Sequence, residues 1–196
     1  MQLMRQPSRF WKRCEGVAAL EFALILPVLL LMFFASLELA MALDCRTRVV
    51  DATASTADLI AQRSSVSAGD LKNILCATKA VISPYSTTGT IKMVVSGITC
   101  KTYGTSCTAK QVSWSSYTTG AAARTAVPDN GTLPLDMFTS SSSGAVMAEM
   151  TYTYTPVTTQ FLAKSITLHW TAYAIPRTGS AVSGVNVQIA DCSLGS

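Results

Sequence analysis

The longest apolar run of the chain lies near its N-terminus. Residues 22–37 carry no charge, and the wider window 17–43 holds only two acids, Glu21 and Glu38. This window exceeds the about 20 apolar residues that a helix needs to cross a bilayer. Four basic residues precede it: Arg5, Arg9, Lys12 and Arg13. They predict that the N-terminus stays in the cytoplasm and that the rest of the chain is exported.

A helical pattern continues beyond the apolar run. Five apolar residues recur at gaps of 7, 4, 3 and 4, which predicts one helix face: Leu43, Val50, Ala54, Ala57 and Ala61. Asp44 precedes Arg48 by four residues, the favourable order for a helical ion pair. We therefore expect one helix over residues 17–62, about 69 Å long at 1.5 Å per residue. Residues 17–43 would be its transmembrane part and 44–63 its periplasmic extension.

The rest of the chain predicts an α+β domain, residues 64–196. Ser67 and Asp70 form the S-x-x-D start of a second, short helix, and Pro84 stands just past its expected end. From residue 88 the pattern has period two, which predicts a small antiparallel sheet of half-buried strands. We expect these strands near residues 91–95, 111–115, 145–155 and 165–175, with a short last one at 185–189. Segment 118–144 is a long loop, either functional or poorly ordered.

Charge and side-chain chemistry narrow the function. The chain has 15 basic and 11 acidic residues, and without residues 1–16 the balance is 11 to 10, because that segment holds four basic residues and one acid. No basic stripe with interleaved aromatics appears, so no nucleic-acid partner is expected. The one histidine, His169, falls on a solvent-facing strand position, and Tyr152, Tyr154 and Trp170 are expected in the sheet core. No catalytic, metal-binding or cofactor motif is present, so we expect no enzyme activity, no metal and no cofactor.

Six cysteines bear on the compartment. Cys14 precedes the apolar run, and Cys45 follows it closely. Four more lie on the exported side, which fits an oxidising periplasm with two disulfides: Cys76, Cys100, Cys107 and Cys192. Four cysteines allow three connectivities. We favour Cys100–Cys107, because Gly104 can turn the intervening loop, and Cys76–Cys192 by elimination. Free buried thiols are the alternative, and Cys45 is either a membrane-proximal thiol or an intermolecular bridge.

Three interpretations of the apolar run compete. It is a plain membrane anchor, a prepilin leader cut at the cytoplasmic edge, or a secretory signal cut after the small-x-small sequence that ends at Ala42. A secretory signal usually has a core of 7–15 apolar residues, and this run is longer. Glu21 inside the run also has no use in such a signal.

Two segments resemble a known family. Gly16-Val-Ala-Ala-Leu-Glu-Phe-Ala-Leu-Ile-Leu-Pro27 resembles the opening of TadE/TadF-type pseudopilins of the tight-adherence (Tad, or Flp) pilus system, G-x-A-x-x-E-F-A-hydrophobic-x-hydrophobic-P. Glu149-Met-Thr-Tyr-Thr-Tyr-Thr-Pro156 is similar to a strand toward the end of TadE-like chains. Arg177, after Ala-Ile-Pro176, fits their closing pattern.

The resemblance implies how the chain is processed and where it acts. A prepilin peptidase would cut between Gly16 and Val17, so that residues 1–16 are a leader. The new ammonium group of Val17 would lie one helical turn from Glu21, the carboxylate expected to serve processing or assembly, and Pro27 would kink the helix. We expect a pilin-like minor pilin in the bacterial inner membrane, with its C-terminal domain in the periplasm or incorporated into an extracellular pilus. Its partners would be lipid, other pilins and inner-membrane Tad assembly proteins.

The implied function is pilus biogenesis, with surface adhesion and biofilm formation as its results. Two alternatives remain open at this stage. One is a membrane-anchored periplasmic binding or adhesin module, and the other is a secreted soluble protein cleaved near Ala42. The sequence of the mature N-terminus separates all three.

Overall fold

The computed structural model describes residues 15–85, 90–127, 133, 137–156 and 165–190. Helix α1 spans Glu15–Ala61 and helix α2 spans Ala68–Val81. Five strands follow: β1 (Thr90–Tyr103), β2 (Cys107–Thr118), β3 (Gly144–Tyr154), β4 (Ile166–Ala174) and β5 (Gln188–Ile189). They form one sheet in the order β4-β3-β1-β2-β5. Every neighbouring pair is antiparallel except β2 with β5. The predicted α+β fold, with a long apolar helix, a short helix and a small sheet, is confirmed.

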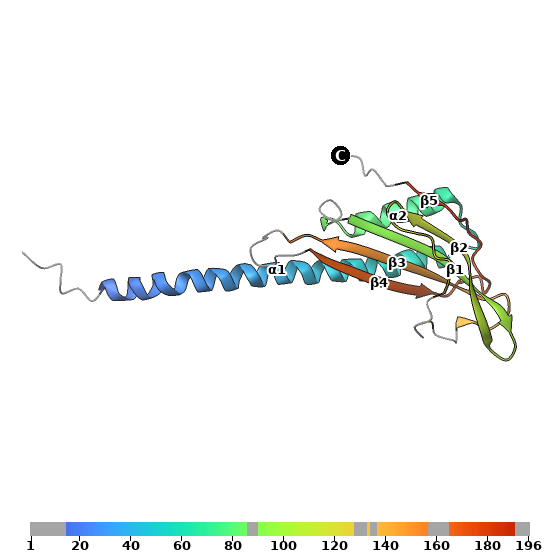
Figure 1. Ribbon diagram of the computed structural model, residues 1–196, viewed down its shortest axis with the longest axis horizontal. Helices are drawn as coiled ribbons and strands as arrows, with labels where there is room; N and C mark the ends of the chain where they lie inside the picture. Colours follow the sequence, from blue (N-terminus) through green and yellow to red (C-terminus); the bar gives the residue numbers. More distant parts are fainter. Residues whose placement is uncertain (1–14, 86–89, 128–132, 134–136, 157–164, 191–196) are drawn as a thin grey trace, which may run out of the picture.

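Helix α1 has two halves with different surroundings. Its N-terminal half projects beyond the rest of the molecule, and its C-terminal half lies along the sheet (Figure 1). Every side chain from residue 17 to residue 37 is exposed, and Glu38 is the first that is buried. The domain therefore begins inside the window of residues 17–43 that the sequence assigns to the membrane.

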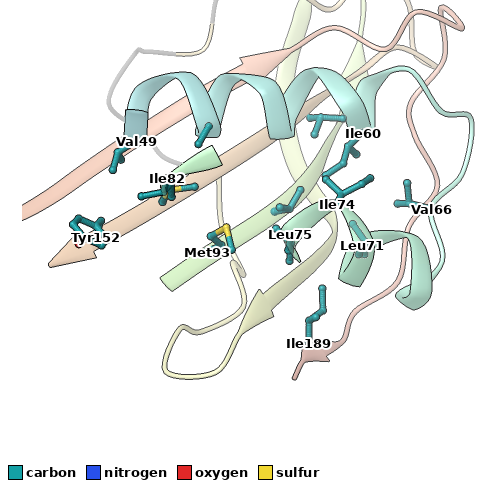
Figure 2. Packing of buried hydrophobic residues seen from close by; sticks show 14 of the residues in the cluster. Val49, Ile60, Val66, Leu71, Ile74, Leu75, Ile82, Met93, Tyr152 and Ile189 are labelled. Carbon is teal, nitrogen blue, oxygen red and sulfur yellow. The ribbon is translucent and has the colours of Figure 1, made fainter. Parts of the chain in front are cut away.

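Both helices cover one face of the sheet and enclose the main core. In Figure 2, Val49 and Ile60 of α1 point into the same cluster as the side chains of α2, β1 and β3. Thr56 and Thr78 join the two helices through a 2.6 Å hydrogen bond between their hydroxyl groups. Small residues at 52, 53, 56 and 57 let α1 approach α2 and the sheet closely. The core thus uses α1 as a structural element of the domain.

The buried face of α1 differs from the one that the spacing predicts. Ala57 and Ala61 are buried as expected, but Leu43 is 53% exposed and Ala54 is also exposed. The buried residues form a face rotated around the helix axis: Glu38, Cys45, Val49, Ala52, Thr53, Thr56, Ala57, Ile60 and Ala61. The prediction counted apolar residues alone, whereas the buried face also includes polar residues such as Glu38, Thr53 and Thr56. Part of the predicted apolar face is therefore free to meet another surface.

Helix α2 begins at the predicted signal. Ser67 is its N-cap, and the Asp70 backbone N–H donates a hydrogen bond to Ser67 Oγ at 3.2 Å. The Asp70 carboxylate accepts one from the Ser67 backbone N–H at 3.1 Å. This reciprocal pair satisfies two N–H groups that the helix leaves without partners. The helix ends at Val81, before Pro84.

The expectation of half-buried strands fails at β3. From Gly144 to Met150 every residue of this strand is buried. One of its faces meets the helices, and the other lies under the segment that joins β2 to β3. That segment supplies Leu133 and Phe138 to a second cluster with Ile98, Ala145 and Met147. The described part of the long loop thus packs its side chains over one end of the sheet.

The segment after β4 contacts the rest of the domain at several points. The Arg177 backbone N–H donates to the Ala61 carbonyl at 2.9 Å, and the Arg177 guanidinium pairs with Asp58 at 2.9 Å. The first contact gives the Ala61 carbonyl at the end of α1 a hydrogen-bond donor. Further along, Trp114 lies where a side chain on Gly97 or Gly184 would collide with its ring, so both glycines are needed for this contact.

Candidate functional site

The predicted processing residues lie in the first turns of α1. The helix begins at Glu15, so Gly16 and Val17 have helical backbone. Glu21 follows Val17 by four residues, which places it one turn further along the same face. The side chains of Val17 and Glu21 are both exposed. An amino end created at Val17 would therefore share one side of the helix with the Glu21 carboxylate.

Pro27 lies inside α1, and the helix continues on both sides of it. Proline has no backbone N–H, so the carbonyl of Ala23 loses its ordinary helical donor. The kink expected at Pro27 stays a prediction.

The exposed half of α1 has the dimensions of a membrane span. Residues 17–37 make about 31 Å of helix at 1.5 Å per residue, close to the about 30 Å of a hydrocarbon core. Large apolar side chains are exposed along its whole length: Leu20, Phe22, Leu24, Ile25, Val28, Leu29, Leu31, Met32 and Phe33. Within the described residues it is the one helix long and apolar enough to cross a membrane. It fits a single-pass membrane anchor.

Glu38 marks the point at which α1 enters the domain. Its side chain is 1% exposed, and the Tyr154 hydroxyl donates a hydrogen bond to Glu38 Oε1 at 3.2 Å. Burial and the nearby Glu38 carboxylate raise the pKa of Tyr154 to about 12. From sequence, Glu38 was only the second acid in the membrane window. The successive gaps from Glu38 to Cys45, Val49 and Ala52 are 7, 4 and 3. This helical spacing is the sequence signal that could have placed Glu38 on the buried face.

A second polar group lies about two to three turns further along α1. Arg48 Nε contacts Asp44 Oδ2 at 2.9 Å, so the predicted ion pair is present. The Tyr85 hydroxyl donates to the same oxygen at 3.1 Å. Hydrogen bonds from Arg48 and then Tyr85 hold the pKa of Asp44 below its usual value. The Tyr85 and Tyr154 rings meet edge to face at 6.0 Å. We call the five residues Glu38, Asp44, Arg48, Tyr85 and Tyr154 the membrane-proximal seam.

The cysteines follow the predicted pattern where the structure describes them. Cys100 and Cys107 are bridged, with 5.8 Å between their Cα atoms, and the bridge closes the tip of the β1–β2 hairpin. Cys76 is also disulfide-bonded. Its predicted partner Cys192 lies outside the described residues, so that pairing stays a prediction. Cys45 is a free, fully buried thiol, and burial raises its pKa to about 11.

The aromatic and histidine predictions have mixed outcomes. Tyr152 and Tyr154 are buried as expected, but Trp170 is 38% exposed. The prediction for Trp170 is wrong because β4 is the edge strand, where only α1 flanks it, and the Arg46 guanidinium carbon lies 5.9 Å from its ring centroid. His169 is exposed, as predicted. No cluster of three or more potential metal ligands occurs among the described residues.

The outer face of the sheet, opposite the helices, carries two hollows. One, of about 300 Å³, lies over β1, β3 and β4 and is lined by Lys92, Glu149, Thr151 and His169 among others. The second, of about 460 Å³, lies over β2 beside Asn186 and Gln188. Arg124 lines both of them.

Comparison with known proteins finds a similarity in the N-terminal part of the chain. Residues 16–58 match the family model described as TadE-like protein. The match starts at Gly16, covers the exposed half of α1 and ends within its buried half. No curated protein has a significant match to the chain, and no solved structure has one either.

Proposed function

Because this chain is TadE-like over residues 16–58, we propose that it is a minor pilin, or pseudopilin, of a Tad pilus assembly and secretion apparatus. In this proposal a prepilin peptidase removes residues 1–16, α1 stays rooted in the inner membrane, and the α+β domain lies in the periplasm. The chain has a structural role without catalysis. It contributes to pilus biogenesis, and through the pilus to adhesion and biofilm formation.

One observation carries the proposal. The family match begins at Gly16, the residue before the predicted cut, and continues through the apolar helix. Cleavage there leaves the exposed residues of α1 on the mature protein. They need a non-aqueous partner, since apolar side chains gain about 25 cal/mol per Å² when removed from water. Lipid supplies that partner before assembly, and the helices of other pilins or inner-membrane Tad proteins supply it afterwards.

The contacts around Glu38 argue against the secreted alternative. A cut after Ala42 would separate Glu38 from Tyr154, to which it is hydrogen-bonded. It would also remove Met41 and Ala42, which pack against the main core. The buried hydroxyl of Tyr154 would then lose a partner, at a cost of about 1–3 kcal/mol. Residues 38–42 therefore pack with the folded domain.

The test is the mass of the mature protein. We expect the full chain, expressed in membranes together with a prepilin peptidase, to lose residues 1–16 and to begin at Val17. Gly16→Leu should keep its leader, because a bulky side chain blocks the peptidase site. A retained leader in the unmodified chain would support a plain anchor, and a start at Leu43 would support a secreted protein. Either result contradicts the proposal.

The role of Glu21 needs a matched control. We expect Glu21→Ala to impair maturation or incorporation into the pilus, while the outer domain stays folded. Glu15→Ala also removes one acid from the first turns of α1, but that residue would leave with the leader. Normal processing and normal piliation in Glu21→Ala would remove the assigned role, and an equal defect in Glu15→Ala would make it a general charge effect.

A further inference from the structure

Three polar side chains form a row across the outer face of the sheet. Lys92 of β1 pairs in register with Thr151 of β3, and Thr151 pairs with His169 of β4. Directly opposite residues in neighbouring strands have Cβ atoms about 5 Å apart. The next residues along, Met93 and Met150, belong to the core under the helices. Because side chains alternate along a strand, the row faces away from the helices.

The row borders the hollow of about 300 Å³. Ala121, Ala122 and Ala123 form an apolar wall, and Arg124 stands beside them. Arg124 is held in place by Glu149, whose Oε2 accepts from Arg124 Nε at 2.8 Å and whose other oxygen contacts a second guanidinium nitrogen. The Arg124 backbone N–H also donates to Ser115 Oγ at 2.8 Å. The wall is thus fixed by contacts that a ligand would not have to make.

The charges in the hollow do not balance. Glu149, which is 6% exposed, neutralises Arg124 through contacts with its Nε and Nη2 atoms. The Lys92 side chain has no ion pair or hydrogen bond among the residues that the structure describes, so one positive charge is unmatched. Thr151 Oγ1 and His169 Nδ1 are 3.0 Å apart, which leaves the other imidazole nitrogen for a ligand. The site therefore offers one cation, hydrogen-bonding groups and an apolar wall.

We propose that this hollow binds a small, singly charged, polyhydroxylated ligand of the sugar-acid class. Its carboxylate would pair with Lys92, a hydroxyl would meet the His169 imidazole, and its C–H face would lie on the alanine wall. A phosphatidylglycerol headgroup has the same chemistry, but Arg46, which stacks on Trp170 next to His169, lies nine residues beyond Leu37. That is about 13 Å along the helix, whereas each headgroup layer is only about 5–7 Å thick.

His169 makes the proposal directly testable, because it is the only histidine of the chain. In the full chain, labelled with ¹³C at the histidine Cε1 and held in detergent micelles, we expect D-galacturonate to shift the single histidine signal saturably. D-galactose at the same concentration should not, since it lacks the charge. Lys92→Gln should weaken galacturonate binding about tenfold or more, as expected for the loss of a charge-assisted contact. Lys101→Gln, at an exposed lysine of the hairpin, should leave it unchanged.

Several outcomes would overturn the proposal. A signal that does not saturate, or a Lys92→Gln protein that binds galacturonate as well as the unmodified chain, would exclude the site. Equal binding of galactose would exclude the role of charge. In nanodiscs, a shift produced by phosphatidylglycerol but not by phosphatidylcholine, without added sugar acid, would assign the hollow to lipid. These outcomes are independent of leader cleavage, so they do not test the pilus proposal.

Discussion

Both halves of helix α1 expose large apolar side chains, but their surroundings differ. Leu30 in the first half is 46% exposed and Leu59 in the second is 42% exposed. All the residues around Leu30 are exposed too, whereas Leu59 is next to the fully buried Ile60. Exposure of one leucine therefore says little about its environment. The surrounding residues indicate whether an exposed leucine side chain contacts water or lipid.

The largest effect is expected from the buried half. Ile60→Ala should lower the free energy of unfolding of the domain by about 2–5 kcal/mol, because it removes a buried side chain and leaves a cavity. Ile25→Ala is the matched change in the exposed half, where the side chain is 54% exposed. It should leave domain unfolding unchanged. Urea denaturation of both variants in the same detergent measures the difference, and equal losses would contradict the division of α1.

The exposed half should respond most strongly to charge. Leu30→Arg should raise the apparent free energy of membrane insertion by about 3–4 kcal/mol, the difference between leucine and arginine near a bilayer centre. Leu59→Arg places the same charge at similar exposure in the other half and should insert normally. A glycosylation-based insertion assay distinguishes the two. If Leu30→Arg inserted as well as Leu59→Arg, residues 17–37 would not be the span.

The two acids of α1 offer a smaller, more specific contrast. Glu38→Ala should destabilise the domain by about 1–3 kcal/mol, since the buried Tyr154 hydroxyl loses an acceptor. Glu38→Gln keeps an acceptor and should recover part of that loss. Glu21→Ala should leave the domain stability unchanged, because its side chain is exposed. Thermal unfolding followed by near-ultraviolet circular dichroism measures the stability of all three variants. A Glu38→Ala protein as stable as the unmodified chain would contradict the stabilising role of the Glu38 contact with Tyr154.

The smallest effect is expected at high pH. The pKa values of Cys45 and Tyr154 are raised to about 11 and about 12 by burial in the folded domain. A raised folded-state pKa contributes stability below the unfolded value, and this is lost as pH rises through the folded value. Stability should thus fall between about pH 9 and pH 12, less so in Tyr154→Phe. Native Cys45 should also react with iodoacetamide more slowly than in urea, and equal rates would contradict its burial.

The sequence was sufficient for the elements whose signals are local. The Ser67–Asp70 capping box set the start of α2, and period-two alternation located β1 to β4. It was insufficient where tertiary contacts decide. The burial of β3 on both faces depends on how Leu133 and Phe138 of the preceding irregular segment fold back over the sheet, and the exposure of Trp170 depends on the edge position of β4. Neither fact has a local signature.

The candidate site divides in the same way. Gly16, Val17 and Glu21 form a contiguous motif, so their order along one helix face follows from the sequence. Glu38 and Tyr154 are 116 residues apart, and the row of Lys92, Thr151 and His169 comes from three strands. Such groupings require the sheet order and register, which a single sequence does not supply.

The continuity of α1 has a mechanical consequence. One helix runs from its exposed N-terminal half to Ile60 in the core without an intervening linker. A force applied to residues 17–37 would be transmitted along the helix to the residues of α1 that pack on the sheet, because no flexible linker separates them. In the filament that we propose, each subunit would transmit tension from its membrane-spanning residues to its outer domain through this one helix.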